Sequence, residues 1–174
     1  MKNKLFIFCV FISLYFPMAF AQQATTVIEP DLKYGRPSKE ELALTAYAPD
    51  TTATAVYLFH KGKSGFTYDD GFRLFTEHWV RIKILKPQGV SHADVTIPYY
   101  APSDRDKEKD GILNLDGCSC NLENGKMTKT RLKRELVSNE RVNTYYKVLK
   151  FSLPTVKVGT VIDCLLYTSP SPRD

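Results

Sequence analysis

The sequence predicts a mainly β fold, an antiparallel β-sandwich-like domain with one short N-terminal helix. Apolar and polar residues alternate from Phe72 to Lys86 and again from Ala93 to Tyr99, as expected for strands that bury one face. The pair Asn124-Gly125 is the strongest turn signal in the chain, because both residues readily adopt a positive φ. Many short strands separated by turns, with almost no helical pattern, are typical of antiparallel sandwiches.

The first 21 residues follow the pattern of a signal peptide. Lys2 and Lys4 form a basic start, and the apolar run that follows ends in the small-x-small sequence Ala19-Phe20-Ala21. That run has roughly 16 residues, fewer than the ~20 that a helix needs to cross a bilayer. We therefore expect cleavage after Ala21, a periplasmic or secreted protein, and no stable membrane span after cleavage.

The mature chain is expected to begin with a flexible lead-in over residues 22–33, followed by a β-rich domain over residues 34–163. Ser38 is followed three residues later by Glu41, which is the capping-box pattern of a helix start. Leu42 gives this short helix an apolar side chain to bury.

The strand predicted over Phe72–Lys86 has two unlike sides, because side chains alternate along a strand. His78 lies on the apolar side, and we interpret it as a core residue and not as a ligand. The other side is charged and carries Arg73, Glu77, Arg81 and Lys83.

Two further strands are predicted over Tyr145–Leu153 and Lys157–Asp163. Residues 164–174 do not continue the second pattern and resemble a translated sequencing-library adapter of the transposase type. A Ser/Pro-rich linker is the alternative. On the adapter interpretation the domain is truncated at its C-terminal end, and glutamate is an alternative to Asp163, because the adapter supplies the last base of that codon. A missing strand beyond Ile162 would leave an unpaired edge, which predicts poor folding.

Four segments of the chain resemble a known family in their order and spacing. They are residues 75–89, 93–100, 121–126 and 151–162. Together they are similar to the domain of unknown function 3857, found in secreted Bacteroidota proteins ahead of a transglutaminase-like domain. The resemblance covers residues 34–162 and implies a β-sandwich-like module followed by a cysteine-protease-like fold that carries the chemistry. Cys118 and Cys120 depart from the family pattern, so the resemblance gives them no role.

The Asn-Gly turn predicts a hairpin register in which Cys118 faces Arg131 and Cys120 faces Lys129. These basic neighbours would make the two thiols more reactive than usual. Catalytic cysteines, however, usually lie at a helix N-terminus beside a histidine, and these two precede a turn on a strand. A structural zinc site needs four ligands, and no second cysteine pair exists in the mature chain. We therefore expect no catalytic, metal or cofactor site, although the chain contains His60, His78 and His92.

Four residues are candidates for facing a ligand. Trp79 and Phe75 share the charged side of one strand and are candidates for stacking on a sugar, with cover by another segment as the preferred interpretation. Lys129 and Arg131 belong to a basic run that suits an acidic glycan or a lipid headgroup, although such runs are more often solvated. The net charge of +5 is too small to indicate nucleic acid as a partner.

These patterns lead to two hypotheses. The first is a non-catalytic N-terminal domain of an exported transglutaminase-like protein, whose partner is its own C-terminal domain, missing from this chain. The alternative is a stand-alone envelope module that binds glycan or protein through the Trp79 side or the basic hairpin. An open frame beyond codon 163 with Cys, His and Asp motifs supports the first hypothesis, and an early stop supports the second.

Overall fold

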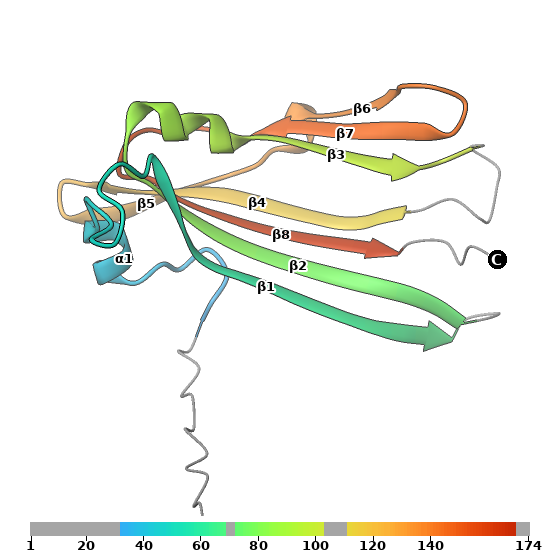
Figure 1. Cartoon of the computed structure of the whole chain (residues 1–174), viewed down its shortest axis with the longest axis horizontal. Helices are drawn as coiled ribbons and strands as arrows, with labels where there is room; N and C mark the ends of the chain where they lie inside the picture. The colour runs from blue at the N-terminus through green and yellow to red at the C-terminus, as the bar shows by residue number, and fades with distance from the viewer. Residues whose placement is uncertain (1–31, 69–71, 103–110, 170–174) are drawn as a thin grey trace, which may run out of the picture. The chain divides into compact units, whose positions relative to one another are not determined.

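The structure is a computed structural model, and it describes residues 32–68, 72–102 and 111–169 (Figure 1). The predicted signal peptide and most of the predicted lead-in lie outside the described residues. Within the described part of the chain, no helix is long and apolar enough to cross a bilayer.

Two antiparallel sheets make up the described domain and confirm the predicted mainly β fold (Figure 1). The five-stranded sheet has the strand order β1 (Ala55–Tyr68), β2 (Phe72–Ile84), β8 (Val161–Ser169), β4 (Gly111–Glu123) and β5 (Lys126–Arg131). The three-stranded sheet has the order β3 (Asp94–Tyr100), β7 (Tyr146–Ser152) and β6 (Val137–Arg141). Neighbouring strands in both sheets are antiparallel.

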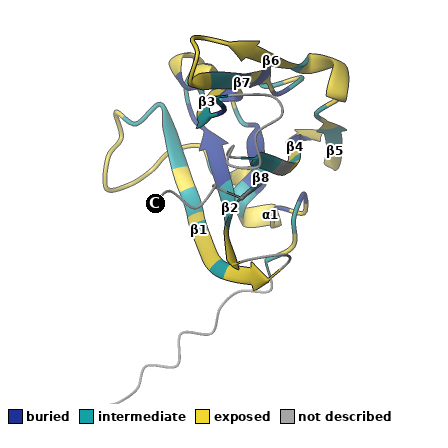
Figure 2. Ribbon diagram, turned by 90° about the vertical axis from the view of Figure 1, so that its right-hand side faces the viewer, coloured by how far each residue is buried: buried dark blue, intermediate teal, exposed yellow. Residues whose placement is uncertain are grey.

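The two sheets share one apolar core. We call the side of the five-stranded sheet that faces the other sheet its inner face, and the opposite side its outer face. On the inner face, Ile82, Ile84 and Ile162 form one buried cluster with Leu149 and Phe151 of β7. Figure 2 shows that buried residues gather where β2 and β8 lie side by side, whereas exposed residues dominate β1 and β6. Removal of these apolar side chains from water is the main stabilising contribution to such a fold.

The predicted capping box begins the helix α1 (Lys39–Ala43). Ser38 Oγ accepts a hydrogen bond from the Glu41 amide at 3.1 Å, and Glu41 Oε2 accepts one from the Ser38 amide at 2.6 Å. Residues 32–44, which we call the N-terminal segment, lie on the outer face, where Leu42 packs in a cluster with Cys118 and Cys120. The sequence pattern does not predict the two short 3₁₀ helices, η1 (Pro87–Ala93) and η2 (Arg134–Leu136).

The predicted hairpin and three of the predicted strands are confirmed. Asn124 and Gly125 have φ values of 51° and 75°, and β4 pairs with β5 in the predicted register. The ends of β2, β3 and β7 lie within two residues of the predicted ends. Each of these features depends on residues close together in the sequence, which is why the sequence predicts them.

The sequence pattern predicts neither β1 nor β6. In β1 the alternation is interrupted by Gly62, which lies between two lysines, by Gly65, and by a register shift between Tyr57 and Phe59. β1 is an edge strand of its sheet, and charged residues are common on edges because they discourage further strand pairing.

β8 differs from the prediction at both ends, since it runs from Val161 to Ser169 and the pattern predicts Lys157–Asp163. Its extension continues the period of two, because Leu166 lines the inner face and Tyr167 stacks on an aromatic ring of the outer face. β8 lies between β2 and β4, so ladder hydrogen bonds on both sides hold it extended. The predicted strand end is therefore wrong, and the unpaired edge expected beyond Ile162 is not seen at this central strand. The adapter origin of residues 164–174 stays a prediction.

Candidate functional site

A buried cluster of charges on the outer face is the first candidate site. Arg81 on β2 lies opposite Asp163 on β8, and their side chains are 1% and 0% exposed. Arg81 Nη2 and Nε donate hydrogen bonds to Asp163 Oδ2 at 2.7 and 3.2 Å. A charge removed from water is tolerated only with such a partner, because its desolvation is otherwise too costly.

The N-terminal segment, which covers the outer face, completes this cluster. Arg81 Nη1 donates to Glu41 Oε2 at 3.0 Å, and Arg81 Nη2 donates to the Lys33 carbonyl oxygen at 2.8 Å. The Gly35 amide donates to Asp163 Oδ2 at 2.7 Å. Gly35 has a φ of 63°, in the left-handed region that glycine adopts without strain. Arg81 and Asp163 together therefore bind the N-terminal segment at three of its residues.

Lys83 extends the cluster along β2. Its side chain is fully buried, and its Nζ donates to the carbonyl oxygens of Leu42 at 2.7 Å and Gly159 at 2.5 Å. Burial lowers the pKa of Lys83, because desolvation disfavours the ammonium form. The charged side of β2 is therefore covered where it carries Arg81 and Lys83.

Trp79 and Phe75, two of the predicted ligand-facing residues, are both half-buried on this outer face. Trp79 Nε1 donates to Asp163 Oδ1 at 2.5 Å, and the indole meets the Phe59 ring edge-on with centroids 4.9 Å apart. Phe75 stacks on Tyr167 with centroids 5.4 Å apart. These contacts favour a covered structural role for Trp79 over a platform for sugar stacking.

Lys129 and Arg131, the other two predicted ligand-facing residues, lie on the edge strand β5. Lys129 is half-buried, with its Nζ 5.9 Å from the ring centroid of Tyr34, whereas Arg131 is exposed. β8 and β4 separate β5 from β2. The structure therefore does not bring the basic pair together with Trp79 and Phe75 into one site.

Cys118 and Cys120 are free thiols that are fully buried below the N-terminal segment. A hydrogen bond from the Cys120 thiol lowers the pKa of Cys118, and the same bond raises the pKa of Cys120. Cys120 Sγ also lies 3.9 Å from the Gly35 carbonyl oxygen. Their predicted basic neighbours are in place, but burial keeps both thiols out of reach of a substrate.

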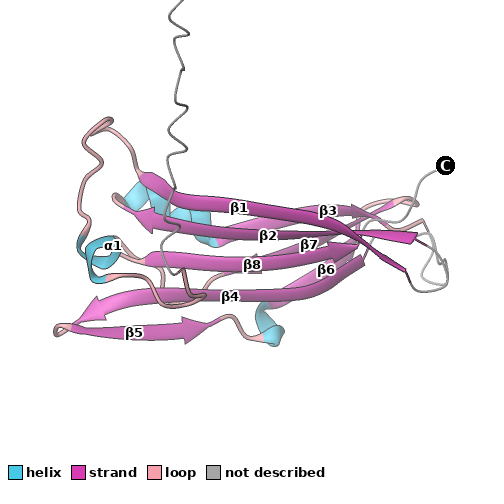
Figure 3. Ribbon diagram, turned by 90° about the horizontal axis from the view of Figure 1, so that it is seen from below, coloured by secondary structure: helices cyan, strands magenta, loops and turns pink. Residues whose placement is uncertain are grey.

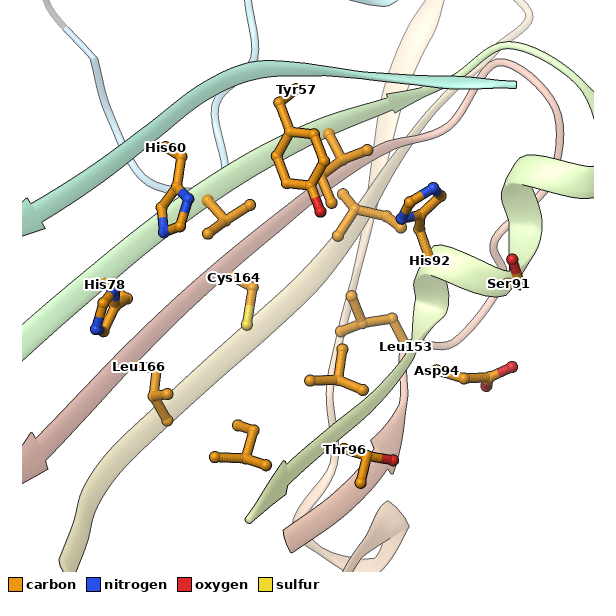
Figure 4. Close-up of a pocket in the computed structure, with 15 residues that line it drawn as sticks. Tyr57, His60, His78, Ser91, His92, Asp94, Thr96, Leu153, Cys164 and Leu166 are labelled. Atoms are coloured by element: carbon orange, nitrogen blue, oxygen red, sulfur yellow. The ribbon is translucent and has the colours of Figure 1, made fainter. Parts of the chain in front are cut away.

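An open cavity of about 450 Å³ between the two sheets is the second candidate site (Figure 4). All three histidines of the chain line it. His60 comes from β1, His78 from β2 and His92 from η1. The ring centroids of His60 and His78 are 5.8 Å apart, and those of Tyr57 and His92 are 6.1 Å apart. His78 is thus half-buried and faces a cavity, whereas the sequence predicts a core position.

The walls of this cavity are mainly apolar. Cys164 belongs to them, and burial raises the pKa of its thiol to about 12, so the thiol stays protonated at neutral pH. The remaining apolar residues come from both sheets and their connections: Val80, Ile82, Val95, Ile97, Leu153, Ile162 and Leu166.

Sequence reasoning missed both sites for the same reason. A period of two shows which residues share a strand face, but it does not show what covers that face. Asp163 was the one available signal for the cluster, because it is an isolated acid within an apolar run. No comparable signal pointed to the cavity, since His60 and His92 lie on elements that the pattern does not predict.

Comparison of the chain with known protein families, curated proteins and solved structures gave no match. Within the described residues, no group of three or more His, Cys, Asp or Glu side chains is arranged to hold a metal ion.

Proposed function

We propose that this chain is a non-catalytic module of an exported protein and that it supports a transglutaminase-like domain following it in the full-length protein. The resemblance of residues 34–162 to a family found ahead of such domains supports this proposal. An exposed apolar surface on the β1–β2 hairpin, at the end of the sheet toward which β8 runs, is the structural observation that carries it.

The thiols of the described residues support the non-catalytic part of the proposal. Cys118 and Cys120 are fully buried on the outer face, whereas the three histidines line the cavity on the inner side. Cys164 does share the cavity with the imidazoles, but its raised pKa opposes formation of the thiolate that acts as a nucleophile. No described cysteine therefore combines access, an activated thiol and a histidine partner.

The exposed apolar surface, which we call the hairpin strip, lies at the far end of the β1–β2 hairpin. Phe66 pairs with Leu74 and Tyr68 pairs with Phe72, so each pair points to one side of the sheet. The register places both pairs on the same side as His60 and Val80, which is the inner face. Phe66, Tyr68 and Phe72 are 72%, 75% and 72% exposed. A cluster of exposed aromatic residues of this kind marks an interaction surface.

The direction of β8 supports a following domain as the partner of this surface. β8 is antiparallel to β2, so from Asp163, opposite Arg81, the chain runs toward the end of β2 that carries Leu74 of the hairpin strip. Figures 1 and 3 show β8 ending at the same end of the sheet as the β1–β2 hairpin. Chain that continues past Asp163 in this direction approaches the hairpin strip, so a following domain reaches the strip without a long linker.

Sequencing of the source locus past codon 163, from a library prepared without transposase adapters, tests the first part of the proposal. We expect an open frame that continues into a domain with separated Cys, His and Asp motifs. An early stop, or a frame that truly ends as residues 164–174, would overturn the proposal and leave the stand-alone envelope module as the leading hypothesis.

A binding experiment between this module and the separately expressed following domain tests the docking surface. We expect Phe66→Ser combined with Phe72→Ser to weaken binding at least about tenfold, since buried aromatic anchors carry much of an interface's energy. Tyr145→Ser is the matched control, because Tyr145 is 57% exposed but lies next to β7 in the other sheet. Equal loss in the control, or no loss in the double variant, would contradict docking on the hairpin strip.

A further inference from the structure

The cavity between the sheets has the size and lining of a small-molecule site. Its volume of about 450 Å³ lies within the range of roughly 300–1,000 Å³ that ligand pockets occupy. Apolar side chains such as Val80, Ile82 and Ile162 line it, and the chain's three imidazoles stand among them (Figure 4). We propose that this cavity binds an aliphatic carboxylate, with the carboxylate at His60 and His78 and the apolar tail along the walls.

His60 and His78 form the end of the cavity that suits an anion. Their ring centroids are 5.8 Å apart, so one carboxylate placed between them can accept a hydrogen bond from each ring. A bound anion also offsets the repulsion between the two rings when both are protonated. Figure 4 shows no acidic side chain among the labelled residues beside this pair.

The opposite end of the cavity suits an anion less well. His92 and Asp94 lie there, with Asp94 immediately following η1, and Figure 4 shows Asp94 across the cavity from His60 and His78. The Asp94 carboxylate repels an anion at that end. This asymmetry in charge sets the orientation of the ligand, with its headgroup at His60 and His78.

The cavity is separate from the hairpin strip. A polar pair, Ser64 Oγ and Thr76 Oγ1 at 3.1 Å, lies between the His60–His78 end and the hairpin strip. All three imidazoles precede residue 164, whereas Cys164 and Leu166 contribute apolar wall to the cavity beside His78. Binding by the chain alone therefore tests this inference independently of the proposed docking of a following domain.

Affinity for the ligand is expected to rise as the pH falls. The titratable groups that face the cavity are Tyr57, His60, His78, His92, Asp94 and Cys164. Imidazoles gain charge between about pH 8 and pH 5, whereas carboxyl groups stay ionised down to about pH 4. Since a charged donor strengthens a hydrogen bond to a carboxylate, we expect decanoate to bind about tenfold more tightly at about pH 6 than at about pH 8.

Titration calorimetry with decanoate and with decanol on the purified chain measures this difference directly. Decanol has a similar tail and no charge, so its affinity should stay constant over the same pH range. NMR of the three imidazole Cε1–H signals provides a second measurement on the unaltered chain. We expect decanoate to raise the pH at which the His60 and His78 signals titrate, with little change for His92.

Variants at the imidazoles then locate the headgroup. His60→Gln combined with His78→Gln should remove the pH dependence and the preference for decanoate over decanol, while His92→Gln, the matched control, keeps both. The proposal is overturned if decanoate and decanol bind alike, if neither binds, or if His92 is the histidine that responds. If the double variant does not fold, the NMR titration of the unaltered chain decides the outcome.

Discussion

Arg81 and Asp163 face each other across strands β2 and β8, with Arg81 Nη2 2.7 Å from Asp163 Oδ2 and both side chains closed to solvent. Every described buried side-chain nitrogen and oxygen has a hydrogen-bond partner, so the pair belongs to a fully bonded cluster. Such a cluster is costly to break at one point, because the remaining charge keeps its desolvation cost and loses its compensation.

Replacement of Asp163 tests this cost. We expect Asp163→Asn to lower the free energy of unfolding by about 3 kcal/mol, because Arg81 then keeps only Glu41 as an acidic partner. Asp163→Glu keeps the charge and adds one methylene, so it should lower the free energy of unfolding by only about 1 kcal/mol. Urea unfolding of both variants measures the difference, and equal losses would show that shape and not charge matters at this position. Tolerance of glutamate also bears on codon 163, where glutamate is the alternative residue.

Glu41 is expected to hold the N-terminal segment to the sheet. Glu41→Gln keeps the capping box but loses the ion pair with Arg81. We therefore expect the free energy of opening the N-terminal segment to fall by about 1 kcal/mol. Hydrogen exchange at the Gly35 amide, which donates to Asp163, reports this local opening. Glu40→Gln is the control, because Glu40 is exposed in the first turn of the same helix. If both variants exchange at the same rate, Glu41 does not fasten the segment.

The thiols of Cys118 and Cys120 should label slowly in the native protein. Both are fully buried under the N-terminal segment, so a thiol reagent reaches them only after that segment opens. We expect labelling to be fast in urea and to accelerate under native conditions in the Glu41→Gln variant. Labelling of the unaltered native chain at the rate of a model peptide would contradict the observed burial.

Cys164 should make stability fall at alkaline pH. Burial raises its pKa from 9.0 to about 12, so above pH 9 the unfolded thiol loses its proton while the folded thiol keeps it. The Cys164 contribution is therefore complete below pH 9 and declines as the pH rises toward about 12, by at most about 1.4 kcal/mol per pH unit. Urea unfolding across this range should show a shallower decline for Cys164→Ala than for the unaltered chain. Parallel curves would mean that the folded thiol titrates normally.

Several parts of this fold are encoded locally, and for that reason the sequence alone determines them. The capping box of α1 needs only Ser38 and Glu41, and the hairpin register follows from Asn124-Gly125. The alternation along β2 shows which side chains share a face. Each of these features involves residues a few positions apart, so no knowledge of distant contacts is required.

The tertiary structure decided which faces are covered and what meets there. Arg81 and Lys83 are buried because the N-terminal segment, some forty residues earlier in the chain, folds over the outer face. His60, His78 and His92 share a cavity because two strands and a 3₁₀ helix converge between the sheets. Alternation along a strand shows which residues share a side, but it does not show which side is exposed to solvent. Only contacts between distant segments decide which side is buried.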